Sequence, residues 1–185
     1  MDIYQIMVKH NRPWSVREII AFMIVFIIVA IILSILVLIK KIKISQAITS
    51  LLFLTFLAIV FASTVFTRQP GVRMYQLEVF WSWKEIFKIG ECGRLGSTGT
   101  EGGLLQENLL NMILLMPAGI LLPFIFNKKI RWWQGLLVGV LISSGIESLQ
   151  LILCRGLFEF DDIMHNSFGC MVGAVLVSRW KKNGR

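Results

Sequence analysis

Residues 19–39, IIAFMIVFIIVAIILSILVLI, form an apolar run of 21 residues in which Ser34 is the single polar side chain. About 20 apolar residues in a helix are enough to cross the hydrocarbon core of a bilayer. Basic residues follow the run in place of a small-residue cleavage site, so we expect a retained helix and not a signal peptide. The run therefore predicts a membrane-spanning helix.

Further apolar segments recur along the chain. They cover residues 44–66, 108–126, 134–153 and 162–180. The composition agrees with a membrane protein, because 56% of the residues are hydrophobic and 16% are charged, whereas soluble domains carry about 25% charged residues. The sequence predicts an all-α, polytopic helix bundle with about five transmembrane helices, in a single membrane domain over residues 1–185. A four-span alternative, with residues 19–39 lying on the membrane surface, is disfavoured by the length of that run.

The basic residues predict an orientation. Three short segments, residues 40–43, 127–131 and 179–185, hold ten of the nineteen Lys and Arg residues and no acid. All three fall on one side of a five-helix path, which is cytoplasmic by the positive-inside rule. The N-terminus and residues 67–107 then lie outside, and the C-terminus lies in the cytoplasm. Anchoring to anionic lipid explains the net charge of +8, so we expect no nucleic-acid partner.

The predicted outer loop, residues 67–107, leaves two alternatives open. Within it, residues 74–87 mix apolar and charged side chains, which suits either an amphipathic helix in the membrane interface or a loop packed on the bundle. Cys92 and Cys154 both fall on the outer side, and the sequence does not decide whether they pair. With an odd number of cysteines and no CxxC motif, we expect no metal site and no cofactor.

Each of the last three predicted helices has a polar pair near its outer end, spaced so that both members share one helix face. With Arg155, which is predicted to be the nearest cation, the set is Asn108, Asn111, Glu147, Gln150, Arg155, Asp162 and Asn166. Carboxylates inside a membrane are costly and mark a functional site by default. We therefore expect these residues to line one ligand-binding cavity open to the outer side. In the alternative reading, they hydrogen-bond across helices to hold the bundle together.

Small residues predict where helices approach one another. Gly135 and Gly139, and then Gly169 and Gly173, have the GxxxG spacing that allows close helix packing. Asp161 lies at the boundary of the last helix, where a carboxylate can cap the free amides of the first turn. Asparagine also caps, so we expect its substitution there to cost little.

Three segments, in chain order, resemble the VanZ-like family of small bacterial membrane proteins. They are ENLLNMILLMPAGILLP, GIESLQ and R..FEFDDI..N..G...G. The family pattern is N-x-x-x-F-x-P-x-G, then E-x-x-Q, then R…D-x-x-D-x-x-x-N-x-x-G, and the resemblance covers residues 108–173. The matching positions are Asn111, Pro117, Gly119, Glu147, Gln150, Arg155, Asp162, Asn166 and Gly169. The chain departs from the pattern at Leu115, Glu159 and His165, and we expect His165 to be an interfacial residue near the outer surface.

The resemblance implies a role at the Gram-positive cell envelope, in low-level resistance to teicoplanin and other lipoglycopeptides, and a place in the bacterial cytoplasmic membrane. Three function classes remain open. The first is a protein that binds membrane lipid, a lipid-linked wall precursor or a lipoglycopeptide. The second is an intramembrane enzyme that uses Glu147 and Asp162 as acid and base, and the third is a small translocase. No nucleophile motif is present, so the catalytic residues stay unknown, as does the oligomeric state.

Overall fold

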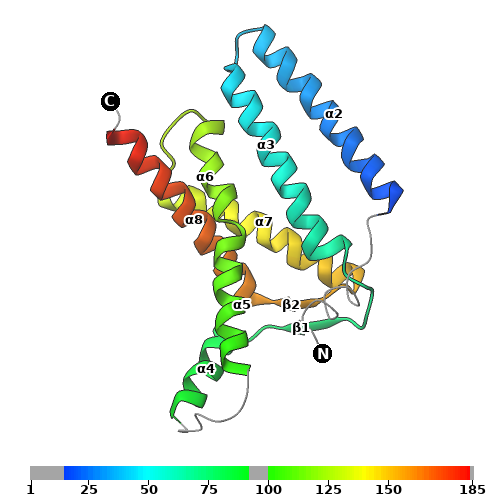
Figure 1. The fold of residues 1–185 in the computed structure, drawn as a ribbon, viewed down its shortest axis with the longest axis vertical. Helices are drawn as coiled ribbons and strands as arrows, with labels where there is room; N and C mark the ends of the chain where they lie inside the picture. Colours follow the sequence, from blue (N-terminus) through cyan, green and yellow to red (C-terminus); the bar gives the residue numbers. More distant parts are fainter. Residues whose placement is uncertain (1–14, 92–99, 184–185) are drawn as a thin grey trace.

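The computed structural model describes residues 15–91 and 100–183, and most of this backbone is helical. The helices are α2 (Val16–Leu38), α3 (Ile44–Phe61), α4 (Trp81–Glu91), α5 (Thr100–Leu114), α6 (Met116–Ile125), α7 (Trp132–Leu153) and α8 (Phe160–Asn183), and a π-helical turn, η1 (Ala62–Phe66), continues α3. Two short strands, β1 (Met74–Gln76) and β2 (Leu157–Glu159), join them (Figure 1). The predicted helical bundle is confirmed.

In the described part of the chain, four segments are long and apolar enough to cross a membrane. They are Val16–Leu38, Ile44–Phe66, Gly103–Ile125 and Trp132–Leu153, and they match the first four predicted spans. The fifth predicted span, residues 162–180, lies in α8, which is less apolar. Because α8 packs against α5, α6 and α7, its neighbours cover much of its surface. The chain is a multi-pass membrane protein.

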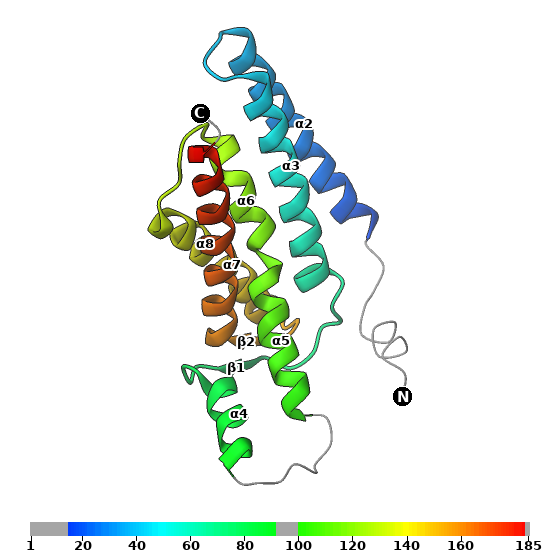
Figure 2. The same cartoon turned by 60° about the vertical axis from the view of Figure 1, so that its left-hand side comes forward.

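Helix α2 stands at the edge of the bundle and packs against α3 (Figures 1 and 2). It begins at a capping box, in which the Glu18 amide donates to Ser15 Oγ and the Ser15 amide donates to the Glu18 carboxylate. None of its side chains is buried, although nearly all of them are apolar. An apolar helix with so much exposed surface is stable only when lipid or another apolar partner surrounds it.

The third predicted span is two helices, because α5 ends at Leu114 and α6 begins at Met116. Pro117 lies in the first turn of α6, where a missing amide is tolerated, and a continuous helix would place its ring against a carbonyl of the preceding turn. Helix α5 also begins at Thr100, earlier than the predicted start at Asn108. Asn108 therefore lies inside a helix that packs against α4, and not in an outer first turn.

Helix α8 is the central helix, and glycines bring α7 against it. A Cβ atom on Gly139 would lie 2.6 Å from the Cα of Ser167, and one on Gly135 would lie 2.9 Å from the Cβ of Ala174. Real Cβ atoms do not approach their neighbours so closely. The first predicted packing pair thus lies at the α7–α8 contact.

The second glycine pair, on α8, faces the broken helix. A Cβ atom on Gly169 would overlap the carbonyl oxygen of Met112 in α5, and one on Gly173 would overlap that of Met116 in α6. The backbones of α5, α6 and α8 are therefore in direct contact. The apolar core, which includes Leu115 at the helix break, lies among these helices and α3.

Strand β1 pairs in parallel with β2, in the register Met74↔Leu157, Tyr75↔Phe158 and Gln76↔Glu159. Residues 74–87, which the sequence left as an interfacial helix or a loop, are this strand and the start of α4. The strands and α4 lie at one end of the molecule, and the α2–α3 connection and the C-terminal end of α8 lie toward the other (Figure 2). Strand pairing thus joins the loops that follow α3 and α7.

Candidate functional site

Asp162 of α8 and Asn111 of α5 are in direct contact. The Asn111 Nδ2 atom donates a hydrogen bond of 2.6 Å to Asp162 Oδ1, and both side chains are half-buried. The close α5–α8 contact at Gly169 places the two side chains within reach of each other. One oxygen of this carboxylate is therefore satisfied by a neutral donor and not by a cation.

Glu147 of α7 is buried, with 1% of its surface exposed. Its Oε2 atom accepts a hydrogen bond of 3.0 Å from the backbone amide of Glu159, the last residue of β2. Asp162 is close enough to Glu147 to repel it electrostatically. The two carboxyl groups that the sequence singled out thus lie in one region. We call Asn111, Glu147, Glu159 and Asp162 the carboxylate cluster.

Asn166 contacts a residue that the sequence analysis did not single out. Its Nδ2 atom donates to Ser143 Oγ at 2.9 Å, across the α7–α8 contact, and both side chains are buried. Its Oδ1 atom is buried and has no hydrogen-bond partner among the described residues. A signal for Ser143 existed in the sequence, because it lies four residues before Glu147 and therefore on the same helix face.

The cation that acts on this cluster is Arg68, which follows η1 and which the sequence analysis missed. Its charge attracts Glu147, Glu159 and Asp162. Burial and the charge of Glu107 both raise the pKa of Glu159, and the hydrogen bond from Trp81 opposes this shift. Arg68 was recognisable as a cation directly after an apolar span, but its distance from the other residues in the chain hid the connection.

Arg155, the predicted nearest cation, binds a backbone carbonyl. Its Nη1 atom donates to the carbonyl oxygen of Phe66 at 3.2 Å. Gln150 donates in the same way to the carbonyl oxygen of Thr64 at 3.1 Å. Both acceptors belong to η1, whose π-helical turn changes the direction of its carbonyl groups, and such turns are frequent at functional sites. Arg155 and Gln150 thus bind η1 and not the carboxylate cluster.

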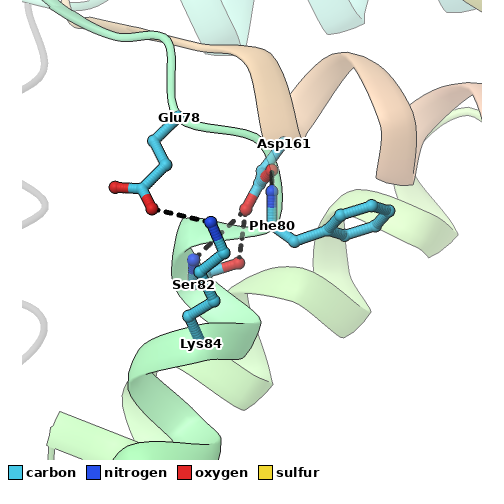
Figure 3. Close-up of polar contacts among 5 residues, drawn as sticks. All are labelled: Glu78, Phe80, Ser82, Lys84 and Asp161. Atoms are coloured by element: carbon cyan, nitrogen blue, oxygen red, sulfur yellow. Dashed lines mark hydrogen bonds and ion pairs between the residues drawn. The ribbon is translucent and has the colours of Figure 1, made fainter.

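The Asp161 side chain points toward the start of α4 (Figure 3). Its Oδ1 atom accepts from the Phe80 amide at 2.6 Å, and its Oδ2 atom accepts from the Ser82 amide at 3.2 Å and from Ser82 Oγ at 2.8 Å. The expectation that Asp161 caps its own helix is therefore wrong. Its carboxylate caps α4, because the β1–β2 pairing brings the start of that helix to the start of α8.

Asn108 is part of the hydrogen-bond network of Asp161 and not of the contact between Asn111 and Asp162. Its Nδ2 atom donates to Ser82 Oγ at 3.2 Å, and the side chain is buried. We call Phe80, Ser82, Asn108 and Asp161 the α4 clamp. The hydrogen bonds of the seven predicted residues therefore fall into four groups. Asn111, Glu147 and Asp162 belong to the carboxylate cluster and Asn108 belongs to the α4 clamp. Gln150 and Arg155 bind η1, and Asn166 binds Ser143.

Two tryptophans of α4 complete the contacts at this end. Trp83 Nε1 donates to His165 Nε2 at 2.8 Å, and Trp81 Nε1 donates to Glu159 Oε2 at 3.2 Å. His165 is 5% exposed, so its side chain is buried against its neighbours, and its expected position at the outer membrane interface stays a prediction. An aromatic donor on a helix 82 residues earlier covers the imidazole, which the sequence pattern could not reveal.

The arrangement is rich in hydrogen-bond acceptors. Glu147, Glu159 and Asp162 converge, and the positive charge that acts on all three belongs to Arg68. Such a group suits a ligand that offers hydroxyl or amine donors. Among the described residues, no three His, Cys, Asp or Glu side chains are placed to hold a metal ion together.

The comparisons with known proteins identify the family. Comparison with curated proteins and with solved structures gave no match. The sequence model of the VanZ/LLP1 family matches residues 26–181, which include every helix from α3 to α7, all but the end of α8 and all of the residues discussed above except the α2 cap. The match extends well beyond residues 108–173, where the motifs lie, and covers most of the chain. This multi-pass membrane protein belongs to the VanZ/LLP1 family.

Proposed function

We propose that the protein binds the polar head of a lipid-linked cell-envelope precursor or of a lipoglycopeptide at the carboxylate cluster, and thereby lowers susceptibility to teicoplanin-type antibiotics. The observation that carries the proposal is the convergence of Glu147 and Asp162, on two helices of the bundle, with Glu159 of the adjoining strand β2. Carboxylates at such a position lower stability unless a function retains them. Sugar hydroxyls or an amine of the ligand would supply donors that the cluster lacks.

The proposed orientation places this cluster toward the outer leaflet of the bacterial cytoplasmic membrane. The strands and the start of α8 lie at one end of the bundle, and the connection through residues 40–43 lies toward the other end (Figures 1 and 2). That connection and the end of α8 carry basic residues, which favour the cytoplasmic side. An amphiphile in the outer leaflet would then reach the cluster with its head while its chain stays in lipid.

An intramembrane enzyme is the second candidate. Glu147 and Asp162 interact electrostatically, as an acid–base pair would. Their hydrogen bonds from Glu159 and Asn111 hold both carboxyl groups in place. A turnover of lipid-linked substrate by the purified protein, abolished by either Glu147→Gln or Asp162→Asn, would favour this class over simple binding.

The test of the proposed function is growth of a susceptible Gram-positive host that expresses the protein, under a lipoglycopeptide and under its deacylated form. Glu147→Gln retains an acceptor for the Glu159 amide, so we expect it to reach the membrane in normal amounts and to lose the protection. Glu78→Gln, which removes an exposed carboxylate paired with Lys84, is the matched control and should protect normally. Full protection by Glu147→Gln at normal abundance would reject the proposal.

A further inference from the structure

A cavity of about 350 Å³ lies beside the carboxylate cluster, at the loops that follow η1 and α7. Arg68, Gly71, Met74, Arg155 and Gly156 are among the residues that line it. The two loops are held together there, because the Gly71 amide donates to the carbonyl oxygen of Cys154. The lining therefore brings together two guanidinium groups from distant parts of the chain.

Both guanidinium groups keep donor capacity. The Nε atom of Arg155 is buried and has no hydrogen-bond partner among the described residues. Among the residues that the structure describes, neither Arg68 nor Arg155 lies at salt-bridge distance from a carboxylate. The φ of Gly156 is +145°, a conformation that favours glycine, and a Cβ atom there would lie 2.7 Å from Arg68 Nη1 and displace this guanidinium. The pocket thus presents two positively charged groups.

A second, apolar cavity of about 410 Å³ lies between the start of α2 and the end of α3. Arg17 and Glu18 line its end, and the rest of its lining is apolar and includes Phe22, Val25, Ala58, Phe61 and Phe66. The cavity lies between two helices that are long and apolar enough to cross a membrane. Volumes of this size are typical of sites for small amphiphiles.

Phe66 links the linings of the two cavities. Phe66 lines the apolar cavity, and its carbonyl oxygen accepts the hydrogen bond from Arg155, which lines the charged one. Arg68, two residues later, also lines the charged cavity. A ligand with a charged head and a long chain could therefore occupy both at once.

We propose that these cavities form one site for an anionic lipid with a phosphate head, in which Arg68 and Arg155 bind the phosphate and the groove between α2 and α3 binds the chain. Arginine recognises phosphate through paired, charge-assisted hydrogen bonds, which matches the two available guanidinium groups. This inference rests on the proposed function in that it names the class of lipid-linked ligand. Because Arg68 also attracts the carboxylate cluster, a bound phosphate would hold the rest of the head group beside that cluster.

The experiment measures equilibrium binding to the full-length protein in phosphatidylcholine nanodiscs, with empty nanodiscs subtracted. The probes are radiolabelled dodecyl phosphate, inorganic phosphate and dodecanol. We expect dodecyl phosphate to bind saturably and the other two probes to bind far more weakly. Arg68→Gln should weaken dodecyl phosphate binding about tenfold or more, as expected for the loss of a charge-assisted contact. Arg73→Gln, an exposed arginine of the same loop, is the control and should bind normally.

A second pair of variants tests the groove that is proposed to bind the lipid's alkyl chain. Ala58→Trp fills the groove and should abolish dodecyl phosphate binding, whereas Ile59→Trp, on the exposed face of α3, should not. Equal binding of inorganic phosphate would show a free-anion site and overturn the role of the groove, and equal binding of dodecanol would overturn the role of the arginines.

The result also separates this inference from the proposed function. If Glu147→Gln abolishes antibiotic protection while the wild-type protein binds no dodecyl phosphate, the lipid phosphate site is wrong and the proposed function stands. If dodecyl phosphate binds through Arg68 while Glu147→Gln protects fully, the site stands and the proposed function is wrong. Arg155→Gln also removes the hydrogen bond to the carbonyl oxygen of Phe66. If the protein then fails to accumulate in the membrane, Arg68→Gln still decides whether a guanidinium group binds the phosphate.

Discussion

Asp161 Oδ1 accepts a hydrogen bond of 2.6 Å from the backbone amide of Phe80, a residue 81 positions earlier in the chain. With the two bonds from Ser82, this carboxylate fixes the start of α4 to the start of α8 (Figure 3). Asp162, the next residue, points instead to Asn111 of α5. Two adjacent acids therefore have different tasks, one in holding the fold and one in the carboxylate cluster.

The first prediction concerns Asp161→Asn. Both carboxylate oxygens accept hydrogen bonds, and an asparagine has one acceptor oxygen and an NH2 group that would face a donor. We expect a loss of about 1.5–3 kcal/mol in the free energy of unfolding, the range for hydrogen bonds to a charged group. Thermal unfolding of the purified protein, compared with the exposed Glu78→Gln variant, measures this. A melting temperature equal to that of the control would show that asparagine caps α4 equally well.

The second prediction is that Asp162→Asn removes antibiotic protection without removing the protein. An asparagine oxygen can still accept the hydrogen bond from Asn111 Nδ2, so the α5–α8 contact is retained while the negative charge is lost. Growth under a lipoglycopeptide and membrane-fraction blotting are measured together. Loss of the protein itself would mean that the carboxylate cluster serves packing and not ligand binding.

A third prediction tests helix packing at Gly169. A Cβ atom there overlaps the Met112 carbonyl oxygen, so Gly169→Ala must separate α5 from α8. We expect a loss of about 3 kcal/mol or more, the upper range for overpacking. Gly145→Ala is the matched control, because its Cβ atom would meet Phe61 at an ordinary 3.7 Å and alanine favours the helix. The abundance and melting temperature of the two variants should differ sharply, and equal values would exclude a close backbone contact.

The fourth prediction concerns pH. Burial raises the pKa of Glu159 above its unfolded value, so the folded state binds a proton more readily than the unfolded state. The contribution of Glu159 to the free energy of unfolding is therefore lost as the pH rises through its unfolded-state pKa and then its folded-state pKa. It is regained on acidification. Glu159→Gln should raise the melting temperature at neutral pH and reduce its dependence on pH. An unchanged slope from mildly acidic to neutral pH would show that Glu159 keeps its ordinary pKa.

The sequence by itself determined the elements that depend on local pattern. Apolar runs of span length predicted the helices, since crossing a bilayer requires about 20 apolar residues in one stretch. The spacing of Glu147 and Gln150, and of Asp162 and Asn166, placed each pair on one helix face, because the helical repeat is fixed. The order of the motifs also indicated the VanZ-like family, which the match over residues 26–181 confirms.

Only the tertiary structure decided which faces meet. The α4 clamp, the β1–β2 pair and the approach of Arg68 to Glu147 join residues about 80 positions apart, and no local pattern encodes a partner at that distance. Asn108 and Asn111 share a helix, yet one contacts Ser82 and the other Asp162, because α4 and α8 pack against different parts of α5. The sequence determines which groups are costly to bury, and the packing of the helices determines which partner offsets each cost.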